Sequence, residues 1–215
     1  IAGISGNGQQ ELAALISGEI RAHQPDMIVI KKQDVGCLGP MQRRELGFAF
    51  VPEERLGRDA VPEMSLADNS LLTAHQKGML WCGIIKRKVE KTFTRRCIEQ
   101  FDVRTPGPDA EAGAMSGGNL QKFILGREIM LSPDVMLVSQ PTWGVDVGAA
   151  TAIRRRLLEM RSQGAAILVI SEELEELFEI CDVLHVLHEG RLSKALPVAE
   201  TTAEKVGTFM LGAKV

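Results

Sequence analysis

The first residues that could do chemistry form a glycine-rich loop near the start of the chain. Residues 3–10 read Gly-Ile-Ser-Gly-Asn-Gly-Gln-Gln, which places Gly3 and Gly8 at the spacing of a phosphate-binding loop. When such a loop opens a helix, its backbone N–H groups can hold an anion. Phosphoryl transfer also needs a lysine and a Mg²⁺-binding hydroxyl, and Gln9 and Gln10 stand in their places. The loop alone therefore fits an anion site or a plain turn between a strand and a helix.

Two further segments follow in a fixed order. Residues 115–122 read Met-Ser-Gly-Gly-Asn-Leu-Gln-Lys and open a predicted helix. A predicted strand at 135–139 then runs into Gln-Pro-Thr-Trp-Gly-Val-Asp at 140–146. This order resembles the ATP-binding cassette (ABC) ATPases, whose signature reads Leu-Ser-Gly-Gly-Gln and whose Walker B strand leads into Asp-Glu-Pro-Thr-x-Gly-Leu-Asp. The resemblance covers the chain from Ile1 onward.

The wording of the motifs narrows the resemblance. The chain is similar to the second nucleotide-binding domain of simple-sugar and nucleoside importers, a family in which two ABC domains lie on one polypeptide. The Ser-Gln-Pro-Thr wording at 139–142 leans toward the nucleoside branch. Nothing explains Trp143, where that branch usually has arginine. The segments that carry the resemblance are Gly6–Gln9, Val51–Arg55, Ser116–Lys122, Gly144–Ala149 and Ile170–Leu174.

The resemblance implies ATP and Mg²⁺ as cofactors, yet the residues for phosphoryl transfer are replaced. Besides the lysine and the hydroxyl, Ser139 replaces the metal-associated aspartate and Gln140 the catalytic glutamate. Glu172 replaces the histidine that reads the γ-phosphate. Gln140 cannot take a proton from water as a glutamate would. We therefore expect no catalytic residue and no metal ligand in cis, and a degenerate Walker A loop made of Gly3, Gly6, Asn7, Gly8, Gln9 and Gln10.

The signature residues, by contrast, are retained. We expect Ser116 to cap the following helix, and Gly117 and Gly118 to let a phosphate approach the N–H groups at its start. In ABC dimers the signature acts on nucleotide held by the opposite domain. The resemblance therefore implies that Ser116, Gly117, Gly118 and Asn119 act in trans, with ATP and Mg²⁺ bound mainly through the partner domain. The alternative is that these residues only cap a helix.

Two acidic residues match further family positions. Asp146 matches the D-loop aspartate, which crosses the dimer interface, and it is also a candidate N-cap for the helix predicted at 148–163. Glu53 follows the strand predicted at 47–51 and stands where the family has its Q-loop glutamine. The run from Glu53 to Arg55 is equally compatible with a solvated turn.

Positioning these residues requires alternating strands and helices. Strands are predicted at 27–30, 47–51, 135–139, 166–171 and 183–187. Helices are predicted at 10–17, 66–76, 86–101, 118–131, 148–163, 172–180 and 203–211. The strands at 135–139 and 166–171 are almost wholly apolar, as expected in a parallel sheet covered by helices on both faces.

The predicted fold class is α/β: a P-loop NTPase-like ABC ATPase domain with an inserted helical subdomain. We expect a sheet core at 1–63 and 113–215 and a helical subdomain at 64–112, which ends in a Pro-Gly-Pro turn at 106–108. Only Ile1 and Ala2 precede the first glycine, so we expect the opening strands to be missing.

Composition excludes several classes of protein. The 215 residues carry a net charge of −3 and are 45% hydrophobic, typical of a globular domain without the electrostatic footprint of a nucleic-acid-binding protein. No apolar stretch of about 18 residues exists to span a bilayer. The four cysteines are expected to be reduced and buried. His185 and His188 lie in a strand-like run where they would face opposite sides, so a shared metal is not expected.

Together these features predict an ATP-binding subunit of an ABC importer for nucleosides or simple sugars, with this half degenerate and supplying its signature in trans. The implied partners are a second ABC domain, membrane permease subunits and an extracytoplasmic substrate-binding protein, with no nucleic acid. The implied location is the cytoplasmic face of the membrane. The rivals are a regulatory dimerisation module that no longer engages nucleotide, and an ABC-type nucleic-acid ATPase, for which a basic face would be required.

Overall fold

The computed structural model describes residues 1–212, and the chain folds into two compact units. Within the described residues, the first unit consists of residues 1–50, 134–141 and 154–212, and the second of residues 51–133 and 142–153. Helix α6 (Val147–Ser162) contributes residues to both. The division into a sheet core at 1–63 and 113–215 and a helical subdomain at 64–112 stays a prediction.

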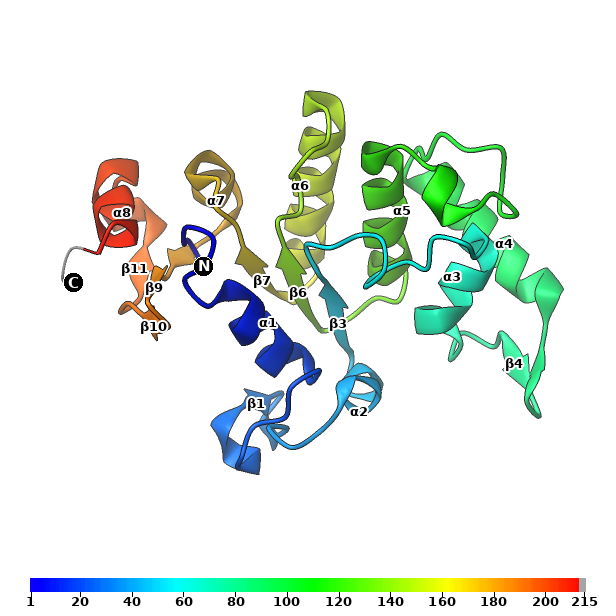
Figure 1. The fold of residues 1–215 in the computed structure, drawn as a ribbon, viewed down its shortest axis with the longest axis horizontal. Helices are drawn as coiled ribbons and strands as arrows, with labels where there is room; N and C mark the ends of the chain where they lie inside the picture. The colour runs from blue at the N-terminus through cyan, green and yellow to red at the C-terminus, as the bar shows by residue number, and fades with distance from the viewer. Residues whose placement is uncertain (213–215) are drawn as a thin grey trace. The chain divides into compact units, whose positions relative to one another are not determined.

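A parallel sheet forms the centre of the first unit (Figure 1). Its strand order is β3 (Phe48–Val51), β6 (Val135–Ser139), β7 (Ala166–Ile170). Strands β6 and β7 run parallel, with Val135 opposite Ala166. Helix α1 (Gln9–Ser17) packs against β6. Four of the five β6 residues are buried, which explains why this strand reads as a continuous apolar run.

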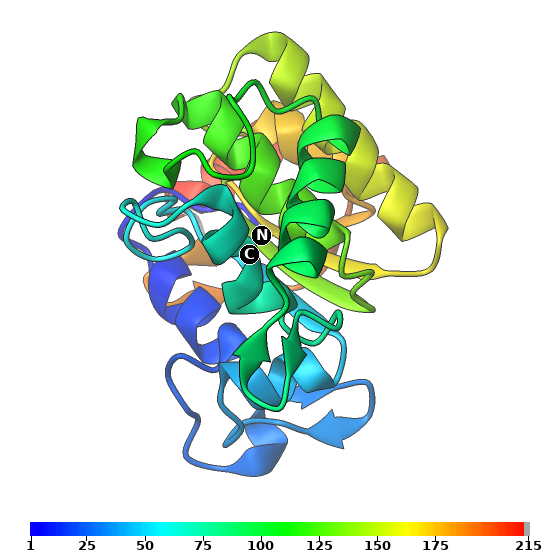
Figure 2. The same cartoon turned by 90° about the vertical axis from the view of Figure 1, so that its right-hand side faces the viewer.

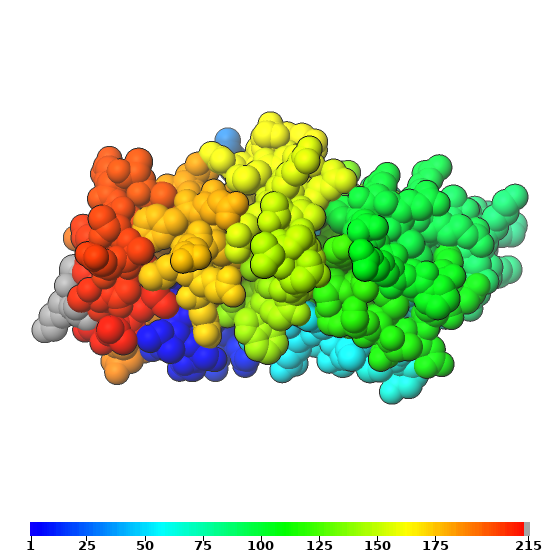
Figure 3. Space-filling model, turned by 90° about the horizontal axis from the view of Figure 1, so that it is seen from above, coloured from blue at the N-terminus to red at the C-terminus, as the bar shows by residue number. Residues whose placement is uncertain are grey.

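Short elements complete the first unit. Helix α8 (Ala203–Met210) lies beside α7 (Leu174–Ile180), as Figure 3 shows in red and orange. The antiparallel pairs are β1 with β2, β8 with β11, and β9 with β10. The remaining bounds are η1 (Pro25–Met27), β1 (Val29–Ile30), β2 (Gln33–Asp34), α2 (Pro40–Glu45), β8 (Val183–Leu184), β9 (Leu187–His188), β10 (Arg191–Leu192), β11 (Leu196–Pro197) and η3 (Val198–Glu200).

Three helices dominate the second unit: α3 (Leu66–Ala74), α4 (Arg87–Gln100) and α5 (Gly117–Ile129), each in contact with the other two. The hairpin of β4 (Leu80–Trp81) and β5 (Ile84–Ile85) connects α3 to α4 and lies at one end of these helices (Figure 2). A short helix, η2 (Ala112–Ala114), precedes α5.

All seven predicted helices are confirmed, with ends within about two residues of the prediction. The prediction of one strand at 183–187 is wrong, because the run changes partner: β8 pairs with β11 and β9 with β10. The strand predicted at 27–30 is reduced to β1, since the residues from Pro25 form a 3₁₀ turn.

The cysteines differ in their exposure to solvent. All four cysteines are free, but only Cys97 is buried, so the expectation of buried thiols is wrong for the exposed Cys37 and Cys82. Both lie in connecting segments, and Cys82 occupies the turn of the β4–β5 hairpin.

None of the helices within residues 1–212 combines the length and apolar character needed to cross a bilayer.

Candidate functional site

The predicted site residues fall into two groups, one in each unit. The glycine loop, Ser139, Gln140 and Glu172 belong to the first unit. The signature residues, Glu53 and Asp146 belong to the second.

The glycine loop leads directly into α1. Gly6 and Gly8 have φ angles of 87° and 105°, a left-handed conformation that glycine adopts without strain. The carbonyl of Gly8 accepts the first hydrogen bond of the helix, from the N–H of Leu12 at 2.9 Å. The sequence prediction of a glycine turn opening a helix is therefore confirmed.

The side chain of Gln9 folds back into this loop and uses both ends of its amide there. Gln9 Nε2 donates to the carbonyl of Ile4 at 2.7 Å, and Gln9 Oε1 accepts from the N–H of Asn7 at 3.0 Å. The amide also lies over Gly3, where an added Cβ would come within 2.5 Å of Gln9 Nε2. An N–H group that a phosphate would need is thus already bonded to the loop's own side chain.

Asn7 fixes the opposite side of the loop. Its Oδ1 accepts from the N–H of Glu189, and its carbonyl accepts from the N–H of Gly190, each at 2.9 Å. Its Nδ2 donates to the carbonyl of Ile4 at 2.8 Å. The loop is therefore tied to the turn between β9 and β10 by side-chain and backbone bonds.

Gln140 follows β6 in a strained left-handed conformation, with a φ of 48°. Its backbone N–H donates to the carbonyl of Ile170 at 2.8 Å, and its Oε1 accepts from the N–H of Glu172 at 3.3 Å. Ser139 is buried, whereas Glu172 is exposed. The structure thus brings the Gln140 side-chain amide to the backbone of Glu172.

The signature residues lie at the start of α5 in the second unit. Gly117 is the first helical residue, and both Ser116 and Gly117 are exposed. Ser116 occupies the N-cap position, but the predicted capping by its hydroxyl is wrong, because it accepts no bond from a helix N–H. Instead, Ser116 Oγ accepts from Asn119 Nδ2 at 2.9 Å. The helix start therefore keeps backbone N–H groups that no N-cap side chain covers.

A guanidinium lies beside this helix start. Arg55 Nη2 donates to the carbonyl of Trp143, and Arg55 Nη1 is so close to Gly117 that an added Cβ there would come within 2.8 Å of it. The sequence placed Arg55 in a segment that carries the family resemblance or in a solvated turn, and gave it no role at the signature, because no local pattern shows which distant segment the side chain reaches. The cation and the helix dipole give this corner of the second unit a local positive potential.

Arg127, near the other end of α5, holds the Arg55 turn in place. Its side chain is fully buried, and its Nη2 binds Asp59 Oδ1 at 2.5 Å while its Nε binds Glu128 Oε1 at 2.9 Å. The turn closes through the N–H of Ala60 and the carbonyl of Arg55, 2.8 Å apart. Helix α5 thus carries the signature residues at its start and, near its end, the Arg127 side chain that binds the segment after Arg55.

The two acidic residues of the second unit have different roles. Asp146 Oδ1 accepts from the N–H of Ala149 at 2.9 Å, so the predicted N-cap of α6 is confirmed. Hydrogen bonds from that N–H and from Gly148 lower the pKa of the exposed Asp146 carboxyl, partly opposed by desolvation. Glu53 lies in an irregular segment after β3, half-buried.

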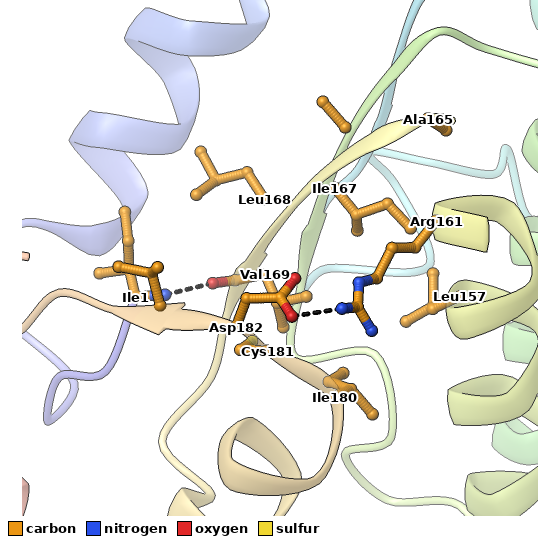
Figure 4. A pocket seen from close by; sticks show the side chains of 12 residues that line it. Ile1, Leu157, Arg161, Ala165, Ile167, Leu168, Val169, Ile180, Cys181 and Asp182 are labelled. Atoms are coloured by element: carbon orange, nitrogen blue, oxygen red, sulfur yellow. Dashed lines mark hydrogen bonds and ion pairs between the residues drawn. The ribbon is translucent and has the colours of Figure 1, made fainter. Parts of the chain in front are cut away.

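A separate pocket of about 310 Å³ in the first unit lies between β7 and the segment before β8 (Figure 4). Its lining is mostly apolar. The α-amino group of Ile1 donates to the carbonyl of Val169 at 2.5 Å, and Arg161 pairs with Asp182 at the rim. Burial lowers the pKa of the Ile1 amino group. None of the residues that line this pocket is a predicted site residue.

Comparison with solved structures defines the class of fold. The chain is similar to the ATP-binding cassette MJ0796 in a dimeric post-hydrolysis state bound to ADP and Pi, with a TM-score of 0.76, 16% identity, and coverage of 92% of this chain and 83% of that one. For MJ1267, a cassette of an ABC transporter in its ADP conformation, the TM-score is 0.70, with 22% identity over 100% and 84% of the two chains. The chain therefore has the ABC ATPase fold, and the predicted fold class is confirmed.

Sequence comparison gives the particular relatives. The chain is 37% identical to the nucleoside import ATP-binding protein NupA of Lactococcus lactis, over 100% of this chain and 42% of that protein. It is 36% identical to the guanosine import ATP-binding protein NupO of Bacillus subtilis, over 99% and 42%. Identity to the ribose import ATP-binding protein RbsA 2 of Escherichia coli O157:H7 is 34%, over 99% and 42%. No family model matches the chain.

These relatives confirm the resemblance seen in the motifs: the chain is a homologue of import ATP-binding proteins for nucleosides and sugars throughout its length. The chain spans about two fifths of the length of the curated relatives it matches.

Proposed function

We propose that the chain is a nucleotide-binding domain of an ABC importer for nucleosides or simple sugars, with a degenerate site of its own and a signature that serves a partner domain. The observation that carries this proposal is a contrast between the two groups of site residues. The glycine loop is filled by its own side chain, whereas the signature helix start is exposed beside a cation.

The first group does not fit ATP and Mg²⁺ held in cis. The Gln9 amide occupies the interior of the loop and bonds the N–H of Asn7. After β6, Ser139 and Gln140 offer no carboxylate for a metal ion or for proton transfer from water. No catalytic step is therefore assigned to this loop.

The second group fits a phosphate presented from outside. Gly117 is exposed, has no side chain to block the helix N–H groups, and lies next to the Arg55 guanidinium. Backbone N–H groups at a helix start together with arginine are a common way to stabilise phosphoryl charge. On this proposal, ATP and Mg²⁺ are bound mainly by the partner's loop, and Ser116 to Asn119 close over the γ-phosphate.

The wider assembly follows from the printed functions of the relatives, which are import ATP-binding proteins for nucleosides, guanosine and ribose. The proposed partners are a second ABC domain, permease subunits and an extracytoplasmic substrate-binding protein. The proposed location is the cytoplasmic face of the membrane. The similarity in fold to a dimeric cassette supports pairing of two such domains.

The test is a charge placed at the signature in the complete transporter subunit. Gly117→Asp adds a carboxylate beside the expected γ-phosphate. The new side chain also contacts Arg55 Nη1, and its negative charge pairs with the guanidinium and removes it from the phosphate. We expect ATPase activity and uptake to fall by about 100-fold or more, the usual effect of losing one group that stabilises transition-state charge. Gln9→Ala should change either rate by less than about threefold, because this side chain bonds only its own loop.

Gly207→Asp is the matched control, because Gly207 lies in α8, where an added Cβ makes only ordinary contact with Leu174. It introduces the same charge in a helix far along the chain and should leave the ATPase rate within about twofold. If Gly117→Asp is silent in a folded transporter, Ser116 to Gly118 only start a helix. If Gln9→Ala abolishes activity, the loop of this domain is in use.

A further inference from the structure

The β4–β5 hairpin presents an apolar pair at its tip. Its two-residue turn, Cys82-Gly83, has positive φ angles of 46° and 78° at both positions, the geometry of a type I′ turn. The register sets Trp81 opposite Ile84, and directly opposed residues of a hairpin share a face. Both are 63% exposed, and Leu80, which lies opposite Ile85, is 41% exposed. The hairpin thus leaves a large aromatic and a branched aliphatic side chain together in solvent.

The stretch of sequence around this pair is basic. No aspartate or glutamate occurs between Asp68 and Glu90, while Lys77, Lys86 and Lys88 are all exposed. The two acids at the ends of that stretch both bind Arg87, at 2.5 Å and 3.0 Å. Within residues 1–212, none of the three lysines forms an ion pair. Three uncompensated cations therefore flank the apolar tip.

We propose that the β4–β5 hairpin docks directly on an anionic lipid surface, with Trp81 and Ile84 in the headgroup region and the three lysines on lipid phosphates. Tryptophan prefers the membrane interface because its ring is apolar and its N–H is polar. Lysines a few residues away keep their ammonium groups in water at the phosphate level. A convex two-residue tip enters a fluid surface readily, whereas a protein partner would need a cavity shaped to receive it.

This contact goes beyond the proposed function, in which permease subunits hold the domain at the membrane. It would fix which side of the second unit faces the lipid. The two features that bind the surface can be tested separately, because the lysines bind its negative charge and the Trp81–Ile84 pair inserts into its apolar layer. Binding should therefore weaken with added salt, while the emission of Trp81 should shift only when the ring leaves water.

The chain offers an internal control, because it has only two tryptophans and both are exposed: Trp81 at 63% and Trp143 at 59%. In the full chain, Trp143→Phe leaves Trp81 as the only fluorophore, and Trp81→Phe leaves Trp143. We expect vesicles with about one third phosphatidylglycerol in phosphatidylcholine to shift the emission of Trp81 to shorter wavelength and to sediment the protein. Pure phosphatidylcholine vesicles should do neither, and the emission of Trp143 should not move.

A second variant tests the cations. Changing Lys77, Lys86 and Lys88 together to glutamine should weaken binding to the anionic vesicles about 100-fold, at roughly fivefold per lysine near the surface. Circular dichroism checks that these surface changes leave the fold intact. Unchanged binding of the triple variant, or a shift of Trp143 in place of Trp81, overturns the proposal. A shift of Trp81 with polyglutamate but not with anionic vesicles overturns it too, in favour of an acidic protein partner.

Discussion

At the scale of single residues, an amide and a guanidinium give the two groups of site residues opposite characters. The Gln9 amide carries both a donor and an acceptor, so it can satisfy the carbonyl of Ile4 and the N–H of Asn7 at once. A lysine has only donors and would leave that N–H free for phosphate. Arg55 has only donors too, and beyond its bond to Trp143 it still faces Gly117 with Nη1. On the proposed function, one side chain closes a site and the other completes one.

The buried Cys97 thiol provides a prediction at this scale. Burial raises its pKa from 9.0 to about 12, slightly opposed by the positive charge of Arg127, so the reactive thiolate is absent near neutral pH. In the native protein at about pH 8, iodoacetamide should modify the exposed Cys37 and Cys82 and leave Cys97 untouched until urea unfolds the chain. Peptide mass spectrometry measures each site. Equal labelling of Cys97 and Cys82 in the native protein would contradict this burial.

The same shift fixes the sign of a pH effect. The folded state holds the Cys97 proton more tightly than the unfolded state does, so this contribution to stability is complete below about pH 9. It is lost as the pH rises from there toward 12, because only the unfolded chain ionises in that range.

At the scale of elements, α5 depends on a buried ion cluster. Removing Arg127 by Arg127→Met would take the guanidinium away from the carboxylates of Asp59 and Glu128, both buried. We expect the free energy of unfolding to drop by about 3–5 kcal/mol, the usual cost of breaking a buried pair. Urea denaturation followed by circular dichroism measures it.

Arg155→Met is the matched control. Arg155 pairs with Glu159 on the surface of α6, and its side chain is 80% exposed. Its loss should change the unfolding free energy by less than about 1 kcal/mol. Equal effects of the two variants would show that the Arg127 cluster is not desolvated as the structure has it.

Most elements were predictable from sequence because their signal is local. The apolar runs of β6 and β7 and the helical period of α4 and α5 survive whatever packs against them. The elements that were missed or misread lack such a signal. The run at 183–187 is divided because β8 pairs with β11 and β9 pairs with β10, and α2 is too short, at six residues, to show a clear period.

The site divides in the same way. The motifs at Gly3 to Gln10 and Ser116 to Asn119 could be predicted, because the spacing of their residues along the sequence identifies them. The fold of the Gln9 amide into its loop and the approach of Arg55 to Gly117 depend on rotamers and on contacts far apart in sequence. The Ser116 hydroxyl, which has an N-cap sequence context, was expected to accept from a helix N–H and accepts from the Asn119 side chain instead, a choice of rotamer that the spacing of the motif does not determine.

At the scale of the whole molecule, the replaced residues predict an inactive chain. With Gln9 in its loop and no carboxylate at Ser139 or Gln140, the isolated 215-residue protein should hydrolyse Mg²⁺-ATP no faster than buffer. A coupled phosphate assay with a sensitivity of about 0.1 per second suffices.

Restoring Gln9→Lys, Gln10→Ser, Ser139→Asp and Gln140→Glu together is the informative companion. This variant should gain nucleotide binding, because it regains the cation and the metal ligand. Mg²⁺-dependent turnover by the unaltered chain would contradict the degenerate assignment.

The Gln9 bonds have a further consequence for how the protein responds to cellular energy. A loop that takes its shape only around a ligand makes folding stability rise with the logarithm of ligand concentration. Here the Gln9 amide makes those contacts within the loop, so the loop is ordered when the chain folds and needs no ligand to keep its shape. On the proposed function, the folding stability of the unit that carries this loop does not change with ATP concentration. ATP concentration then affects the protein only through nucleotide bound between this domain and its partner.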